Sequence, residues 1–353
     1  MARGTVKKSS ETLDDILKRI NKTSGSNIVS YGIPERDYDR IPFTSPRMNY
    51  CTYGGLPRGR LIEFYGEEHG GKTTTALDIV ANFQQIEMGK DEPTQAAYFD
   101  VENTLDVKWA KKLGVDVDSL IVFQPETETA EDIFQTVLDM IETRQIGLVV
   151  IDSIAALVSD QEMDKDMSER TYAGISMPLT VFGRKAELLC KKTNCSIIGI
   201  NQLRDDLRAT WGDGTKTPGG RAWRHLCTVR MKFTRGSFID NNGKDLNRSS
   251  ESPSGNIILM QMDKNKTCPP NRRGGYYTIR YDSGIDYLTD LINVAEKYGL
   301  IQQSGAWFSI VDPDTGEVVA DKLQGSNRVR EYLEDEEHEE TLVFIENYID
   351  SKI

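Results

Sequence analysis

Residues 66–73 have the types and the spacing of a phosphate-binding loop. They read Gly-Glu-Glu-His-Gly-Gly-Lys-Thr and fit the pattern G-x-x-x-x-G-K-[ST]. An apolar run at 60–65 precedes the loop and a helix-like run at 74–80 follows it, which is the expected strand–loop–helix setting. Glycines allow backbone N–H groups and the helix N-terminus to face phosphate oxygens. The sequence therefore predicts a nucleotide-binding protein.

Two side chains of this loop have direct chemistry with a polyphosphate. Lys72 supplies a positive charge for the outer phosphates, and the Thr73 hydroxyl can bind Mg²⁺. A chance glycine-rich turn is the alternative, and the flanking strand and helix patterns disfavour it. The residues expected to contact the nucleotide here are Gly66, Glu67, Glu68, His69, Gly70, Gly71, Lys72, Thr73 and Thr74.

Acidic and amide side chains end three further apolar runs. Asp152 ends the run at 147–152, and we expect it to hold Mg²⁺ beside the phosphates, because strand ends line the ligand crevice of a parallel sheet. Glu102 follows the run at 95–100 and is the candidate base that orients and deprotonates water, with Asp100 as its nearest competitor. Gln202 ends the run at 196–201 and can hydrogen-bond a γ-phosphate, although a plain strand-end amide is the alternative.

Two long irregular segments follow strand ends on the same side of the predicted sheet. Residues 203–223 carry few apolar side chains and no periodicity, and a loop of this length is usually functional or disordered. Trp211 can pack or stack there, and residues 217–220 allow close backbone approach to a ligand. A second loop at 159–171 follows Asp152. Two such loops are suited to bind a second polymer under the control of the bound nucleotide.

The elements that position these residues alternate between strand and helix, which predicts a mostly parallel twisted sheet with helices on both faces. The expected fold class is α/β, with a phosphate-loop ATPase core. The last two of the predicted strands are expected to be antiparallel. We expect strands at 60–65, 95–100, 119–124, 147–152, 196–201, 226–233, 256–263 and 276–281, and helices at 72–88, 129–144 and 173–193.

Three regions are expected along the chain. Residues 1–35 form an N-terminal helix and linker for oligomerisation, with an amphipathic helix at 9–22 capped by Ser9 or Ser10. Residues 36–284 form the ATPase core. The segment 28–58, which spans the boundary between these two regions, looks irregular. Residues 285–353 form a small α/β domain. Its expected elements are helices at 287–298 and 329–349 and strands at 307–310 and 317–320.

The composition is that of a globular, reduced, cytoplasmic protein. The chain has 353 residues, of which 38% are hydrophobic and 28% charged, and no apolar run approaches the roughly 20 residues that cross a bilayer. The five cysteines form no C-x-x-C pair, so we expect buried or idle reduced thiols. We expect no membrane partner. The net charge of −12 disfavours non-specific DNA binding over the whole surface. An acidic run at 331–340 is either a solvated helix face or a competitor for basic sites.

These motifs, in this order, resemble the bacterial RecA recombinase family from about residue 40 to about residue 310. Departures from the family pattern predict a divergent member, phage-encoded or otherwise distant. The matching segments are 55–60, 66–73, 112–116, 151–157, 200–202, 217–220, 264–266 and 305–307, together with Asp106.

The resemblance implies roles for individual residues. Glu102 matches the family's catalytic glutamate and Gln202 its γ-phosphate-coupled glutamine, while Lys264 and Lys266 match lysines that reach the neighbouring subunit's ATP. The adenine would lie against Asp106, Trp109 and Tyr281. The loops at 160–172 and 203–222 match the two DNA-binding loops. The expected DNA contacts are Thr180, Arg184, Arg204, Trp211, Gly219, Gly220 and Arg221.

The resemblance also implies an activity. We expect an ATP- and Mg²⁺-dependent recombinase that polymerises on single-stranded DNA into a helical filament, with ATP at the protomer interface. It would pair that strand with homologous duplex DNA and exchange strands, and its ATP hydrolysis would depend on DNA. Two alternatives stay open: a ring-forming motor or helicase built on the same core, and a DNA-coating regulatory protein that binds ATP as a structural ligand.

Overall fold

The computed structural model describes residues 11–25, 29–31, 38–165, 174–205, 215–247 and 250–353. The chain divides into two compact units, Met1–Tyr38 and Asp39–Ile353. In the first unit, helix α1 (Leu13–Ser24) begins after Thr12, whose side chain forms a reciprocal capping box with Asp15. The predicted cap at Ser9 or Ser10 is therefore wrong; both serines lie outside the described residues. None of the residues of α1 is buried.

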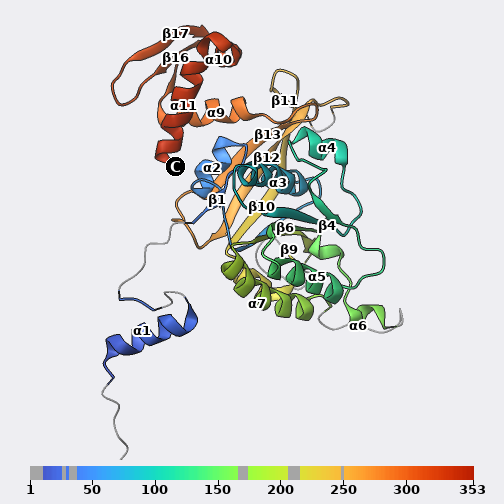
Figure 1. Cartoon of the computed structure of the whole chain (residues 1–353). Helices are drawn as coiled ribbons and strands as arrows, with labels where there is room; N and C mark the ends of the chain where they lie inside the picture. The colour runs from blue at the N-terminus through green and yellow to red at the C-terminus, as the bar shows by residue number, and fades with distance from the viewer. Residues whose placement is uncertain (1–10, 26–28, 32–37, 166–173, 206–214, 248–249) are drawn as a thin grey trace, which may run out of the picture. The chain divides into compact units, whose positions relative to one another are not determined.

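The second unit is built on one large mixed sheet, which confirms the predicted α/β fold class (Figure 1). Its order is β14-β13-β12-β10-β3-β7-β6-β4-β5. The strands from β10 to β5 run parallel, whereas β12, β13 and β14 are antiparallel, as predicted for the first two. The bounds are β3 Leu61–Gly66, β4 Gln95–Asp100, β5 Ile121–Phe123, β6 Ile146–Asp152, β7 Ser196–Gln202, β10 Val229–Ile239, β12 Gly255–Asn265, β13 Gly274–Arg280 and β14 Gly284–Ile285.

Helices cover both faces of this sheet because its central strands are apolar on both sides. Helix α3 (Lys72–Met88) packs on the face that carries Ile62 and Phe64. Helices α5 (Ala130–Glu142), α7 (Ser176–Thr193) and α8 (Gly220–Leu226) pack on the face that carries Leu61. Figure 1 shows α5 and α7 side by side on their face of the sheet.

The parallel register aligns the polar ends of the strands in one row. Gly66 at the end of β3 pairs with Gln202 at the end of β7. Asp100 at the end of β4 likewise pairs with Asp152 at the end of β6. The site predicted from the sequence therefore lies along one edge of the sheet, at the carboxyl ends of four strands.

Several short elements were not predicted. Helix α2 (Pro46–Thr52) lies in the region expected to be irregular; Ser45 caps it and Pro46 occupies its first turn. Helix α8 begins inside the segment expected to be a loop. The other short elements are β1 Arg40–Ile41, β2 Leu56–Pro57, α4 Val107–Lys112, η1 Ile154–Ala156, α6 Asp160–Met163, β8 Arg204–Asp205, β9 Thr215–Lys216 and β11 Asp245–Leu246.

The C-terminal residues enclose a hydrophobic core of their own. The single helix predicted at 329–349 is wrong, because Asp335 adopts an extended backbone and its side chain accepts a hydrogen bond from the N–H of Glu337. The acidic side chains of the 331–340 run are all exposed. The elements are α9 Tyr287–Tyr298, β15 Ile301–Ser304, β16 Trp307–Val311, β17 Val318–Gln324, α10 Ser326–Glu334, η2 Glu336–His338 and α11 Glu339–Lys352.

No helix among the described residues has the length and apolar character needed to cross a membrane.

A buried ion pair fixes the far end of α3. The guanidinium of Arg58 lies 2.7 Å from the carboxylate of Glu87. The same carboxylate accepts hydrogen bonds from Lys90 and from the N–H and hydroxyl of Thr94. Burial by itself raises the pKa of Glu87, but these hydrogen bonds outweigh it and hold the pKa at about 2. Glu87 therefore joins the end of α3 both to the segment before β3, through Arg58, and to the start of β4, through Thr94.

We predict that Glu87→Gln lowers the free energy of unfolding by about 3–5 kcal/mol, because Arg58 stays buried without its charge partner. The carboxylate's contribution should be complete above about pH 4.5 and decrease as the pH falls towards 2. Urea titrations from pH 3 to pH 7 measure both effects. Glu142→Gln, at the exposed end of α5, is the matched control and should change stability by less than about 0.5 kcal/mol. Equal stability of the two variants at pH 7 would contradict the prediction.

Candidate functional site

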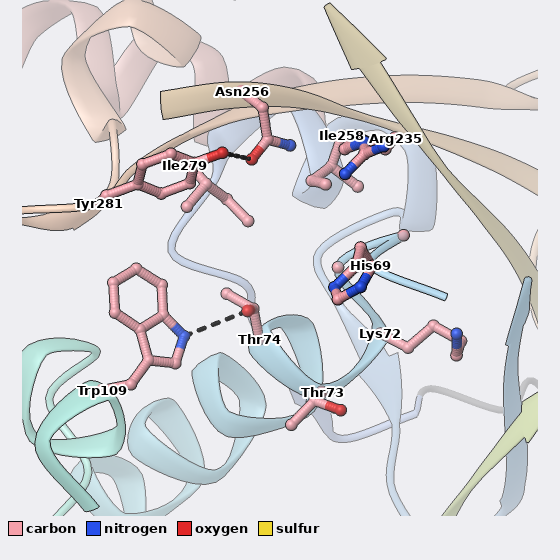
Figure 2. A pocket seen from close by; sticks show the side chains of 12 residues that line it. His69, Lys72, Thr73, Thr74, Trp109, Arg235, Asn256, Ile258, Ile279 and Tyr281 are labelled. Carbon is pink, nitrogen blue, oxygen red and sulfur yellow. Dashed lines mark hydrogen bonds between the residues drawn. The ribbon is translucent and has the colours of Figure 1, made fainter. Parts of the chain in front are cut away.

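The phosphate loop lies between β3 and α3, with the backbone of β10 close beside it. A Cβ atom on Gly66 would lie 2.0 Å from the carbonyl oxygen of Phe233, so only glycine fits there. The loop opens on a cavity of about 460 Å³ (Figure 2). The lining residues are His69, Gly70, Gly71, Lys72, Thr73, Thr74, Trp109, Arg235, Asn256, Ile258, Ile279 and Tyr281.

Lys72 is almost fully enclosed at the start of α3. Its ammonium donates to the carbonyl oxygens of Gly66, at 3.2 Å, and Glu67, at 2.6 Å. Burial lowers the pKa of Lys72, while the nearby carboxylates of Asp152 and Glu102 raise it. The ammonium is thus held against the loop by carbonyl groups that phosphate oxygens could replace.

Asp152 connects β6 to the phosphate loop. Its Oδ2 accepts hydrogen bonds from the Thr73 hydroxyl, at 2.8 Å, and from the Tyr98 hydroxyl, at 2.7 Å. Burial raises the pKa of Asp152, whereas these two hydrogen bonds lower it. Sequence reasoning missed Tyr98, because a tyrosine within an apolar strand reads as a core residue.

The residues present fit a magnesium site. A hydroxyl and a carboxylate, which Thr73 and Asp152 supply, are oxygen ligands of the kind that Mg²⁺ prefers. No group of three or more His, Cys, Asp or Glu side chains in the described part of the chain could hold a metal by itself. Further ligands would come from phosphate oxygens and water, which is the usual coordination of Mg²⁺ beside a nucleotide.

Glu102 lies between two strand ends. Its Oε1 accepts hydrogen bonds from the Ser153 hydroxyl, at 2.5 Å, and from the side-chain amide of Gln202, at 3.2 Å. These contacts bring together the candidate base and the candidate γ-phosphate sensor.

The competitor Asp100 has a different environment. It is 1% exposed. Its carboxylate accepts from the N–H groups of Thr104, at 3.0 Å, and Leu105, at 3.1 Å, and from the amide of Gln124, at 3.1 Å. A carboxylate used in this way holds the loop after β4, so the geometry favours Glu102 as the base.

The far end of the cavity is aromatic and polar. The indole N–H of Trp109 donates to the Thr74 hydroxyl at 3.2 Å, and the Tyr281 hydroxyl donates to Oδ1 of Asn256 at 2.9 Å (Figure 2). Both rings line the cavity, as expected for residues beside a base. Asp106 is not among the lining residues. It caps α4 by accepting from the N–H groups of Lys108 and Trp109, and its contact with adenine stays a prediction.

Four lining residues were missed by sequence reasoning: Arg235, Asn256, Ile258 and Ile279. They come from β10, β12 and β13, three successive strands that the folded sheet places on one side of β3. Asn256 and Ile258 lie on one face of β12, because side chains two residues apart in a strand point to the same side. This alternation was the signal in the sequence that could have identified them together.

Lys264 and Lys266 do not line this cavity. They lie at the end of β12, where the ammonium of Lys264 donates to the carbonyl oxygens of Arg224, at 2.7 Å, and His225, at 2.9 Å. Lys266 donates to the same His225 carbonyl at 3.3 Å. Both ammonium groups therefore lie at the C-terminal end of α8, where the helix dipole favours positive charge.

Two of the candidate DNA residues line a second hollow, of about 650 Å³. Arg204 and Gly219 line it, and the Arg204 guanidinium donates to the Ala155 carbonyl at 2.9 Å. Gly219 has a φ of 93°, and a Cβ atom there would lie 2.3 Å from the side chain of Leu179 on α7. The starts of α7 and α8 are thereby packed together.

Four of the other candidates lie on helices α7 and α8. Thr180 lies one turn into α7 and donates to the Ser176 carbonyl at 2.7 Å. Arg184 is exposed further along the same helix, and Gly220 and exposed Arg221 begin α8. Trp211 lies outside the described residues.

Comparison with known proteins gives matches along almost the whole chain. The RecA N-terminal domain matches residues 11–286 and the RecA C-terminal domain matches residues 289–353. Protein RecA of Ruminococcus albus is 34% identical over 314 residues, covering 89% of this chain and 72% of that protein. Protein RecA of Mesoplasma florum is 33% identical, and the match covers 92% of this chain and 91% of that protein. Protein RecA of Bordetella petrii is 32% identical, and the match covers 99% of this chain and 91% of that protein.

We predict that Tyr98→Phe raises the Mg²⁺ concentration for half-maximal nucleotide binding by about 10-fold, because Asp152 loses a hydrogen bond that orients it. A Mg²⁺ titration of nucleotide binding measures this change. Tyr287→Phe is the matched control, since Tyr287 also donates to a carboxylate, that of Glu346, in the C-terminal core. An unchanged Mg²⁺ requirement in a folded Tyr98→Phe protein would show that Tyr98 does not position the carboxylate.

Proposed function

Because the chain belongs to the RecA family, we propose that the residues at the ends of β3, β4, β6 and β7 bind and hydrolyse ATP with Mg²⁺. The chain is a recombinase of homologous recombination and DNA repair, and its enzymatic activity is DNA-dependent ATP hydrolysis. It binds nucleotide and DNA and forms filaments. Single-stranded DNA and homologous duplex DNA are the polymers that we assign to its loops.

In this proposal the phosphate loop and Lys72 bind the phosphates of ATP through backbone N–H groups and one ammonium. Thr73 and Asp152 would hold Mg²⁺, which neutralises developing negative charge when it is bound. Trp109 and Tyr281 bind the base, with Asp106 as a further candidate at its amino group. The enclosure of Lys72 and the hydrogen bonds of Asp152 support these assignments.

Glu102 orients water and accepts its proton as the water attacks the γ-phosphorus. Gln202 reports the γ-phosphate to the loop that follows β7. The observation that carries this proposal is the hydrogen bond of 3.2 Å between the Gln202 amide and Glu102. Gln202 ends β7, and Arg204 follows it at the second hollow, which we assign to DNA. Loss of the γ-phosphate can therefore change the affinity for DNA.

The neighbouring copy in a filament would complete the site. Lys264 and Lys266 would leave the end of α8 and contact the ATP bound by the next copy, which makes turnover depend on assembly. Thr180, Arg184, Arg204, Trp211, Gly219, Gly220 and Arg221 are the proposed DNA contacts. We also propose a cytoplasmic location, which the family and the five free thiols support.

We predict that Lys72→Ala abolishes ATP-dependent binding to single-stranded DNA, because the phosphates lose their buried positive charge. Fluorescence anisotropy of a labelled oligonucleotide, with and without ATP, measures the effect. Lys191→Ala, on the exposed end of α7, is the control and should bind DNA like the parent. Filaments of Lys72→Ala that still form only with nucleotide would contradict the mechanism.

For Glu102→Gln we predict retained ATP-dependent DNA binding with a turnover lower by about 10²–10⁴-fold, the range expected for loss of a general base. Phosphate release is measured with and without single-stranded DNA, and electron microscopy records whether the filaments persist. Glu126→Gln, an exposed carboxylate after β5, is the control. Turnover within about 3-fold of the parent would rule out Glu102 as the base, because a general base contributes far more.

A further inference from the structure

The phosphate loop carries a histidine whose side chain faces the nucleotide cavity. His69 lines that cavity together with Lys72 and Arg235, and Figure 2 shows its imidazole on the cavity side of the loop. The side chain is exposed. Within the described residues, no hydrogen bond or ion pair engages the imidazole. A titratable ring with no partner in its own chain is therefore available to a ligand in the cavity.

The backbone at His69 belongs to a tight turn. The N–H of Gly70 donates to the Glu67 carbonyl at 3.3 Å, which closes a tight turn around Glu68 and His69. His69 has a φ of 57°, in the left-handed region that non-glycine residues adopt at a cost. Strained backbone of this kind persists where the surrounding structure requires it, and it concentrates at functional sites.

Several charged groups surround His69 in the nucleotide cavity. Lys72 on α3 and Arg235 on β10 are the cations of the cavity wall, and Tyr281 at the end of β13 is its other titratable group. Glu67 and Glu68 belong to the same loop, and they raise the pKa of Lys72 together with the carboxylates of Asp152 and Glu102. Histidine is the side chain whose charge ordinarily changes between pH 5 and pH 8. His69 can thus supply a further cation that depends on pH.

We propose that His69 is a pH-dependent contact for the phosphates of bound nucleotide, so that affinity increases when the imidazole gains a proton. This inference rests on the proposed function, because it takes the cavity to be the nucleotide site. A phosphate group stabilises the protonated ring, so the nucleotide-bound protein takes up a proton. By linkage, the added affinity is complete on the acid side of the titration and is lost as the pH rises.

The test measures nucleotide affinity without DNA and without turnover. The probe is ATPγS with Mg²⁺, titrated calorimetrically from pH 5.5 to pH 8 into the full-length protein. His69→Asn removes the titratable ring and keeps a residue type that tolerates positive φ. His69→Lys replaces it with a permanent cation. The remaining histidines of the chain are His225 and His338. His338 is half-buried and stacks on Tyr332 beside the C-terminal core, and His338→Gln is the matched control.

The ratio of the Kd of His69→Asn to that of the parent isolates the imidazole, because titration of the nucleotide itself is common to both proteins. We expect this ratio to be about 5–10 at pH 5.5, as for one charge-assisted contact, and about 1 at pH 8. His69→Lys should keep tight binding across the range, and His338→Gln should follow the parent.

A ratio that does not change with pH would overturn the role of His69 while leaving the proposed function intact. A parent protein that binds no ATPγS at any pH would instead refute the proposed function itself, and the inference with it.

Discussion

The alignment of parallel strand ends is the constraint on which the rest of this structure depends. Because β3, β7, β6 and β4 run in one direction, their last residues lie along one edge of the sheet. Gly66 permits the phosphate loop to leave that edge, since any side chain there would collide with the carbonyl of Phe233. The same alignment of strand ends brings Asp152 and Gln202 close to the phosphate loop. The ion pair of Arg58 and Glu87 then holds the opposite end of α3, which keeps Lys72 and Thr73 in place.

Two connections meet at the second hollow. Gln202 is hydrogen-bonded to Glu102 at the nucleotide side, and Arg204, two residues later, lines the hollow assigned to DNA. Helix α8 begins at that hollow with Gly220 and ends at the carbonyl groups that hold Lys264 and Lys266. One short helix therefore lies between the DNA residues and the two lysines that we assign to the neighbouring copy. Coupling between nucleotide and DNA requires only that these two connections have more than one stable arrangement.

The central strands and the phosphate loop were predictable because their signals are local. Buried parallel strands are continuous apolar runs, and the loop has fixed spacing. The role of Tyr98 was not predictable, since only the pairing of β4 with β6 brings its hydroxyl to Asp152. Helix α8 was missed because packing stabilises it: Trp223 is fully buried and stacks near Phe182. The cap of α1 at Thr12 and the helix break at Asp335 were missed because both depend on hydrogen bonds from the backbone to a side chain. Hydrophobic periodicity carries no information about such bonds.

A reconstruction of the filament on single-stranded DNA with ATPγS and Mg²⁺ tests most directly whether the nucleotide is shared between copies. The account predicts density for Lys264 and Lys266 of one copy within about 3 Å of phosphate oxygens held by the phosphate loop of the next, which is hydrogen-bonding distance. The same map should show Lys72 of that next copy on the other side of the triphosphate. A nucleotide enclosed entirely by one chain, with both lysines still at the end of α8, would contradict the account.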